Sequence, residues 1–570
     1  MEVSLSHSPI LDRFFAHYYQ HRPVNATFTG VHKYDKMLPD WSPEGLAATS
    51  AEMVTLRQQL SLDIRAHVDS DGFIVSEEPA DIDCALADAF LEIQIAEYEG
   101  SHFQRGNPAL YSGEAVFSVV SLMLRDFAPA NDRVTALEQR LLDIPDFLAQ
   151  AHRSVEGRPV PASWTARALD ECDGAVLLLS DGISRWCAAN NLEKNTVAAL
   201  ERAAKRSLAA FFGFRSWIES RPEAAPEASG AGPDFFDLVL KRGHWDYRSR
   251  EDLLEEIRDR FEEADGKLTE MADAVDPGGW EAVASRLGEI HADADGYLSA
   301  FEDTWSACRD LAVERDLVTW PDFPIRYVQV PDWAREAAPH LYFLNYRSPA
   351  PFDEVPVLDY LVPPIDRAAD AETQQSFLRG VNDSVVKLNH VVHHGAIGHH
   401  VQNFNAIRSR SRIGQIAAVD CASRIGMFCG GSLAEGWACY ATDLMGEVGF
   451  QTDLELVAEQ HSRLRQLARA IVDIELHQHS WTEADARQFY QERIGMSAGA
   501  AAREVTRNSM FPGASIMYWL GTQGIHDLRS ALEAKEGSEF SLRSFHDKFL
   551  SYGSIPVLLI ARLMAGSFSK

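Results

Sequence analysis

Apolar residues recur at helical spacing through most of this 570-residue chain. In the segment that follows Ser249, apolar side chains fall on one side of a helix, and Glu and Arg fill the other side. Ser249 with Asp252 three residues later is typical of a capped helix start. The same periodicity runs through residues 83–98, 134–153, 191–219, 456–478 and 483–499. The pattern predicts a mainly α fold.

Strand-like runs are confined to the middle of the chain. They are rich in aromatic and β-branched residues, are bounded by Pro, and occupy residues 325–331, 341–346 and 359–364. We expect a small β-sheet near residues 325–364. A Pro/Ala/Gly-rich connection at residues 221–233 joins two helical segments. We predict one helical domain, residues 1–570, with two lobes around a central cleft, approximately residues 1–320 and 321–570.

The charge balance argues against several classes of partner. Lys and Arg number 53 against 84 Asp and Glu, which gives a formal net charge of −31. Nucleic acids and anionic membrane surfaces are bound through a surplus of Lys and Arg, which this chain lacks. The most apolar stretches, which start at Val116 and Ile555, are far shorter than the roughly 20 residues that cross a bilayer. We therefore expect no nucleic acid and no membrane as a partner.

The N-terminal residues and the cysteines indicate the cellular compartment in which the protein is expected. The first residues carry an acid at Glu2 and lack the basic opening and apolar core of a secretory signal. The 7 cysteines are scattered without a CxxC pair, which is typical of reduced thiols. Both features predict a cytoplasmic protein. Cys421, Cys429 and Cys439 fall near the motifs described next, where we expect them to be small buried hydrophobes.

Histidines gather between His390 and His400. The chain reads HVVHHGAIGHH there, which places five of its 20 histidines in one short segment. Histidine is the commonest metal ligand, so the cluster predicts a metal or catalytic site. The alternative is a polar or pH-sensitive helix face.

Spacing limits which of these histidines can share an ion. On a regular helix His390 and His394 lie one turn apart and face the same way, as in a zinc-binding HExxH helix. His393 can meet His399 or His400 only across a bulge or break in the helix. Such a break would cost little conformational energy at two glycines, Gly395 and Gly398.

Glu435 lies in a second motif, LAEGWACYATDLM, on an otherwise apolar helix. A carboxylate there is costly to bury unless it is paired or bound to a cation. Glu435 follows His399 by 36 residues, which suits a third ligand that arrives from a second helix. The alternative is a Glu that is exposed or paired with an arginine.

The two motifs resemble the signature of the bacterial family named domain of unknown function 885. That signature is His-Glu-x-x-Pro-Gly-His-His, followed later by Glu-Gly-Trp-Ala. Here residues 393–400 read HHGAIGHH and residues 435–438 read EGWA. Other segments that resemble the family lie at residues 11–35, 232–249, 473–482 and 512–521. The resemblance therefore extends over most of the chain.

The family is similar in architecture to helical zinc peptidases of the gluzincin type, such as the thermostable carboxypeptidases. By this resemblance His393, His399 and Glu435 would hold Zn²⁺ or another divalent transition metal. Tyr518 would donate a hydrogen bond to an oxyanion. Three further polar residues would orient ligands, bind a substrate carboxylate or form a buried salt-bridged network: Asp473, His477 and Arg507.

The chain departs from the family motif at two positions, with His394 at the Glu and Ile397 at the Pro. In a zinc hydrolase that Glu is the general base, so its replacement puts ordinary peptidase activity in question. His394 could replace it as the base, because an unperturbed imidazole titrates near about 6.5. It could instead be a ligand, together with His390 or with His399.

These observations favour a metal-dependent hydrolase that cleaves an amide or peptide bond in a small molecule or short peptide. Two alternatives stay open: a metal-dependent lyase or other non-hydrolytic metalloenzyme, and an inactive, peptidase-like binding protein. The survival of the complete ligand set beside the lost Glu favours an enzyme over an inactive relative. The sequence leaves the substrate and the oligomeric state open.

Overall fold

The computed structural model describes residues 8–64, 74, 76–225, 229–354 and 357–565. Within these residues the protein is mainly α, as the sequence predicts, with one two-stranded sheet. Two sequence arguments fall partly outside the described part: the secretion-signal argument, which uses residues 1–7, and the connection at 221–233, which includes residues 226–228.

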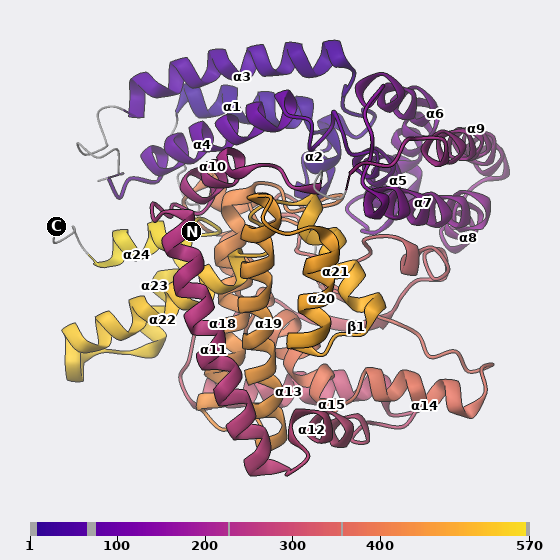
Figure 1. The fold of residues 1–570 in the computed structure, drawn as a ribbon. Helices are drawn as coiled ribbons and strands as arrows, with labels where there is room; N and C mark the ends of the chain where they lie inside the picture. The colour runs from indigo at the N-terminus through magenta and orange to yellow at the C-terminus, as the bar shows by residue number, and fades with distance from the viewer. Residues whose placement is uncertain (1–7, 65–73, 75, 226–228, 355–356, 566–570) are drawn as a thin grey trace.

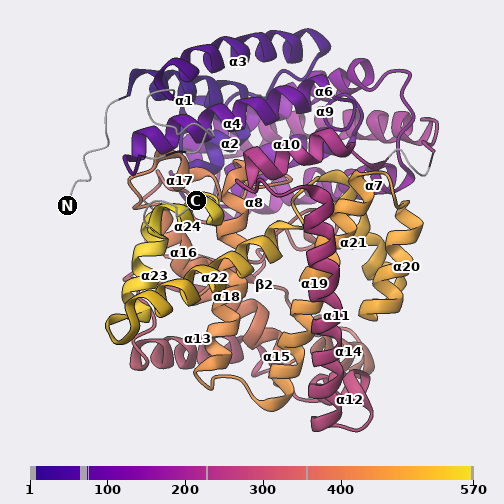
Figure 2. The same cartoon turned by 60° about the vertical axis from the view of Figure 1, so that its left-hand side comes forward.

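The first part of the chain forms a layer of packed helices at the top of Figures 1 and 2. Three of the predicted periodic segments lie in its long helices, α4, α6 and α9. Helix α5 is rich in apolar residues and is buried along its whole length. The elements of the layer are α1 (Pro9–His21), α2 (Pro23–Thr29), η1 (His32–Tyr34), α3 (Pro43–Ile64), α4 (Pro79–Glu99), α5 (Ala109–Met123), α6 (Ala130–Ser154), α7 (Ala162–Leu177), η2 (Leu178–Gly182), α8 (Ile183–Ala189) and α9 (Lys194–Glu219).

The chain then crosses to the other part of the molecule through α10 (Pro233–Gly243), α11 (Arg250–Val275), α12 (Gly279–Gly288) and α13 (Tyr297–Glu314). The predicted cap of α11 is present, because the Ser249 side chain accepts a hydrogen bond from the Asp252 N–H. The apolar side of α11 is buried against α19 (Asp453–His477), and Figure 2 shows the two helices side by side.

The predicted sheet is smaller than expected. Strands β1 (Ile325–Gln329) and β2 (Leu358–Val362) pair in parallel, with Ile325 opposite Leu358. The run at 341–346 is not a strand; it follows the short helix η4 (Ala338–His340) and makes turns. Its Asn345 carbonyl accepts one backbone hydrogen bond from the sheet, from the Leu361 N–H at 2.8 Å. A single contact of this kind does not extend the ladder.

The remaining helices surround the candidate site. The predicted helix at 483–499 is in fact two helices, because Gly495 adopts a left-handed conformation (φ 72°) that ends the first of them. In chain order the elements are α14 (Ala371–Gly380), α15 (Asp383–Val385), η5 (Val386–Gly395), α16 (His399–Ala406), α17 (Arg412–Ile416), η6 (Phe428–Gly430), α18 (Gly431–Glu447), α19, α20 (Glu483–Ile494), α21 (Ala498–Met510), α22 (Met517–Glu536), η7 (Gly537–Glu539), α23 (Leu542–Ser551) and α24 (Val557–Ala565).

The apolar core does not break at residue 320. The main cluster takes side chains from helices on both sides of that position, including α5 and α18, and a second cluster lies between α11, α19 and α20. The division into lobes 1–320 and 321–570 therefore stays a prediction that corresponds to no gap in the core. No helix of the described residues is both long and apolar enough to cross a membrane.

Candidate metal centre

The histidine cluster lies where one helix ends and another begins. Helix η5 is a π-helix that ends at Gly395, and α16 begins at His399. The Gly398 N–H donates to the carbonyl of Val392, six residues earlier, so the chain turns more widely here than in an α-helix. A Cβ on Gly398 would overlap with the carbonyl oxygen of His393. The break that the sequence predicts at these glycines is present.

Three histidines meet across this break. His393, His394 and His399 each offer a ring nitrogen, and these atoms lie within 4.8 Å of one another. The Glu435 carboxylate reaches the same place from α18, with Oε2 3.4 Å from His393 Nε2 and 3.6 Å from His399 Nε2. Atoms that share a tetrahedral zinc ion, at bond lengths of about 2.0–2.1 Å, lie roughly 3.3 Å apart. The donor set therefore fits one divalent transition metal ion.

The orientation of His394 is fixed by the main chain. Its Nδ1 lies 2.6 Å from the Asn389 carbonyl oxygen, which can only accept, so Nδ1 carries the proton. The lone pair is then on Nε2. A histidine held in this way by a backbone carbonyl is typical of metal sites.

His390 and His400 do not belong to the cluster. His390 Nδ1 is 2.6 Å from the Tyr360 hydroxyl in a buried contact, and His400 Nε2 donates to the Phe323 carbonyl at 2.7 Å. Neither residue lines the cavity that contains the other three histidines. The one-turn pair of His390 and His394 that a regular helix would give is therefore not formed, because the helix is widened at this point.

Burial and neighbouring charges set the protonation of the cluster. Burial lowers the pKa of His393, and burial with the charges of the adjacent histidines lowers the pKa of His394 further. Burial also acts on His399, but contact with Glu435 outweighs it and raises the His399 pKa. Burial would raise the pKa of Glu435, yet His393 and His399 hold it well below its ordinary value. Glu435 is thus held ionised, as a metal ligand requires, whereas His399 has to give up its proton before it can bind an ion.

The cluster opens into a cavity of about 580 Å³. Three arginines also line it, one of which, Arg469, is paired with Glu504 at 2.7 and 2.9 Å. Arg465 and Arg507 form no ion pair with any described carboxylate. A cavity with unpaired guanidinium groups can bind an anionic part of a substrate.

Tyr518 enters the same cavity from the first turn of α22. Arg507 Nη2 donates to the Tyr518 hydroxyl oxygen at 3.1 Å, which leaves the phenol's own proton for another acceptor. Burial raises the Tyr518 pKa, so the hydroxyl keeps that proton at neutral pH. Tyr518 and Arg507 therefore both line the cavity that contains the three histidines, and their roles stay predictions.

Asp473 and His477 are fully buried, and their side chains form hydrogen bonds with backbone groups. The Asp473 carboxylate accepts hydrogen bonds at 2.9–3.0 Å from three amides of the segment that leads into α22: Gly513, Ser515 and Ile516. His477 accepts from the Ala231 N–H and donates to the Asn508 carbonyl, both at 3.0 Å. Burial lowers the His477 pKa to about 3, so it forms no charged pair with Asp473. Of the three additional residues predicted, only Arg507 reaches the cavity.

Sequence reasoning missed Arg465 and Arg469. Both belong to a row of polar residues spaced four apart on α19. Most residues of this row are buried, because the helix packs in the core. The row consists of His461, Arg465, Arg469, Asp473 and His477. Charged residues at this spacing on the core side of a helix are the signal that could have identified them.

A second group of side chains meets the same distance criterion. His17 and His21 on α1 and Glu52 on α3 have ligand atoms within 4.8 Å of one another. The Glu52 side chain is 57% exposed, so this group lies at the surface. Any measurement of metal content has to separate it from the buried cluster.

Solved structures with the same fold are known. One, described as "a putative lipoprotein of unknown function" from Shewanella oneidensis, matches with a TM-score of 0.75 at 20% identity and covers 98% of this chain and 100% of its own. Another, described as a "putative lipoprotein" from Colwellia psychrerythraea, matches with a TM-score of 0.75 at 16% identity and covers 97% and 98%. At these identities the likeness shows the fold alone. Neither description names a zinc peptidase, so that similarity stays a prediction.

These structures correct the expected cytoplasmic location, because both are described as lipoproteins, a class anchored to a membrane by lipid. The expectation rested on the first residues and on the scattered cysteines. Residues 1–7 lie outside the described part, and free, buried cysteines in the folded body do not distinguish a lipid-anchored protein from a cytoplasmic one.

No curated protein sequence matches the chain. The model of one family does, and it matches residues 23–564, nearly the whole length. This agrees with the resemblance carried by the motifs at 393–400 and 435–438. The chain belongs to the family described as bacterial protein of unknown function, DUF885.

Proposed function

We propose that the protein is a metal-dependent hydrolase of an amide or peptide bond in a small substrate. The observation that carries the proposal is the meeting of His393, His394 and His399 within 4.8 Å, with Glu435 in contact with two of them. Imidazoles with one carboxylate suit zinc and other divalent transition metals. His393, His399 and Glu435 would hold the ion. Such an ion, when bound, supplies Lewis-acid polarisation of a carbonyl group.

The roles of the other residues follow from their positions. Tyr518 can donate its free proton to the oxygen on which negative charge develops. Arg507 supports that hydroxyl and can also bind an anionic group of the substrate. His394 presents its unprotonated Nε2 to the site, where it is either a fourth ligand or the base.

The metal content of the purified protein tests this proposal. We expect one ion per chain at the buried cluster in wild type, and much less in His393→Ala and Glu435→Ala. His17→Ala with His21→Ala is the matched control, because it removes the surface group and leaves the buried cluster intact. Equal metal in wild type and in both buried-site variants would refute the proposed centre.

His394→Glu then separates the two roles of His394 and tests hydrolysis. The variant restores the motif carboxylate, and we compare it with wild type on a panel of peptides and amides. Cleavage by wild type supports His394 in the role of the base. An inert wild type with an active variant supports a hydrolase scaffold in which His394 is a ligand. Inactivity of both, with metal bound, would refute hydrolysis.

A further inference from the structure

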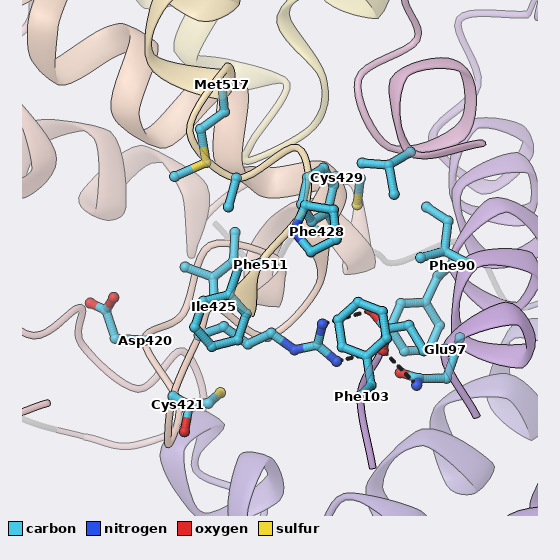
Figure 3. A pocket seen from close by; sticks show the side chains of 18 of the residues that line it. Phe90, Glu97, Phe103, Asp420, Cys421, Ile425, Phe428, Cys429, Phe511 and Met517 are labelled. Atoms are coloured by element: carbon cyan, nitrogen blue, oxygen red, sulfur yellow. Dashed lines mark hydrogen bonds and ion pairs between the residues drawn. The ribbon is translucent and has the colours of Figure 1, made fainter. Parts of the chain in front are cut away.

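A second, smaller cavity adjoins the candidate metal centre. Its volume is about 90 Å³, and Figure 3 shows the side chains around it. Glu435 and Arg507 line both this cavity and the larger one. Three other residues also line both: Tyr342, Asp420 and Ile425. The two spaces therefore meet beside the carboxylate that faces the histidines.

The walls of the small cavity are mainly apolar. Figure 3 shows the rings of Phe103, Phe428 and Phe511 around one space, with Met517 at its edge. These side chains come from parts of the chain far apart in sequence, so the cavity exists only in the folded protein. Phe90 and Ile425 extend the same apolar lining.

Three of the charged groups in these walls have polar partners of their own, while Arg22 lies over the rings of Tyr18 and Phe90, and Arg507 donates to Tyr518. Arg424 forms two hydrogen bonds of 2.6 Å with Glu97. Asp420 accepts from the N–H and the hydroxyl of Ser348 at 2.9 and 3.0 Å. Arg242 forms ion pairs with two carboxylates of α4, Asp88 and Glu92. A charged occupant would gain no free counter-charge from these groups, whereas an apolar occupant would be transferred from water into an apolar space.

We propose that this cavity is the subsite for one apolar side chain of the substrate, of the kind found in leucine or phenylalanine. The inference rests on the proposed function, because Glu435 of the candidate metal centre lines this cavity. The reacting carbonyl lies at the histidine cluster in the larger cavity, and the side chain beside it enters the smaller one. The substrate class is therefore an amide or peptide with an apolar residue next to the bond that is cleaved.

Two hydroxamates test the subsite, because they share a metal-binding group and differ in apolar length. We use acetohydroxamate and 3-phenylpropanohydroxamate with the zinc-loaded full-length protein, and measure affinity by calorimetry. Burial of a phenyl-sized group is expected to strengthen binding roughly 10- to 100-fold. A gain of less than about 3-fold for the longer probe would overturn the subsite.

Cavity-filling variants localise the effect. Val239→Phe and Ala514→Leu add volume at residues that line the small cavity and not the large one. We expect both to abolish the advantage of the phenyl probe and to leave acetohydroxamate binding unchanged. Val313→Phe is the matched control, because Val313 is 55% exposed on α13. Retention of the full advantage in both filling variants would overturn the proposal.

A metal-free arm separates this proposal from that of the metal centre. Toluene binding to the metal-free protein is followed by saturation-transfer NMR. We expect binding by wild type and Val313→Phe, and none by the filling variants. Failure of acetohydroxamate to bind would refute the metal centre alone, while failure of toluene to bind wild type would overturn the apolar subsite.

Discussion

The crossing of α18 and α22 carries two of the candidate site residues and depends on a pair of glycines. Glu435 precedes Gly436 on α18, and Tyr518 lies on α22 one turn before Gly521. A Cβ on Gly436 would overlap with the backbone of Gly521, and a Cβ on Gly521 would overlap with the carbonyl oxygen of Ser432. The two helices can approach this closely only because both residues lack a side chain.

Gly436→Ala is expected to destabilise the protein. Extra methyl groups in a packed core typically cost about 1–3 kcal/mol of unfolding free energy, because side chains and backbone have to shift. Here the added Cβ meets backbone atoms, which cannot rotate away, so we expect about 3 kcal/mol. The displacement of α18 should also weaken metal binding through Glu435.

Gly266→Ala is the matched control, since it makes the same chemical change in an exposed position of α11. A Cβ there meets no atom within 4 Å. Alanine restricts the unfolded chain and favours helix, so this variant should gain about 0.5–1 kcal/mol. Urea unfolding followed by circular dichroism measures both variants. A Gly436→Ala protein within about 0.5 kcal/mol of wild type would refute the close-packing argument.

Three further predictions concern the site and the two ion pairs of one histidine. Tyr518→Phe should keep the metal content of wild type and lower kcat by about 10²- to 10³-fold, because it removes one donor to the oxyanion; an unchanged kcat in a steady-state assay would contradict that role. Removal of the metal with a chelator should lower the midpoint of thermal unfolding, since a ligand held at 1,000 times its Kd stabilises the folded state by about 4 kcal/mol; a midpoint that chelation leaves unchanged in wild type would argue against a bound ion. The third concerns His32, where contacts with Asp35 and Asp353 outweigh burial and raise the pKa to about 9. A raised histidine pKa stabilises the folded state fully below the unfolded value of about 6.5, and this stabilisation is lost as the pH rises through 9. The difference in unfolding free energy between wild type and His32→Gln should therefore shrink from pH 6 to pH 10, and a difference that is constant over this range would rule out the ion pairs.

Several parts of the fold could be predicted because their cause is local. Helical periodicity located α4, α6, α9, α11 and α19, and the Ser249 cap was recognised from two residues. The prediction was less accurate where the backbone depends on one residue or on distant partners. Gly495 ends a helix that the apolar pattern would continue, and the run at 341–346 finds no strand to pair with.

The features of the candidate site were likewise predictable where their cause is local and unpredictable where it is not. The His and Glu residues could be named from their types and spacing, and the break at Gly398 was expected from its freedom of conformation. The rejection of His390 and His400 could not be predicted, because it depends on Tyr360 and Phe323, which are distant in sequence. The same holds for Asp473, whose three amide partners lie about 40 residues away.

The sequence by itself determined the family, the helical class and a set of candidate metal ligands, because motifs and periodicity are properties of neighbouring residues. Only the tertiary structure decided which of the five clustered histidines converge, that unpaired arginines and Tyr518 share their cavity, and that an apolar space opens beside Glu435. The physical reason is that convergence depends on how helices pack, and packing is set by contacts between residues far apart in the chain. At α18 and α22, two glycines 85 residues apart set the helix separation that brings Glu435 and Tyr518 to one cavity.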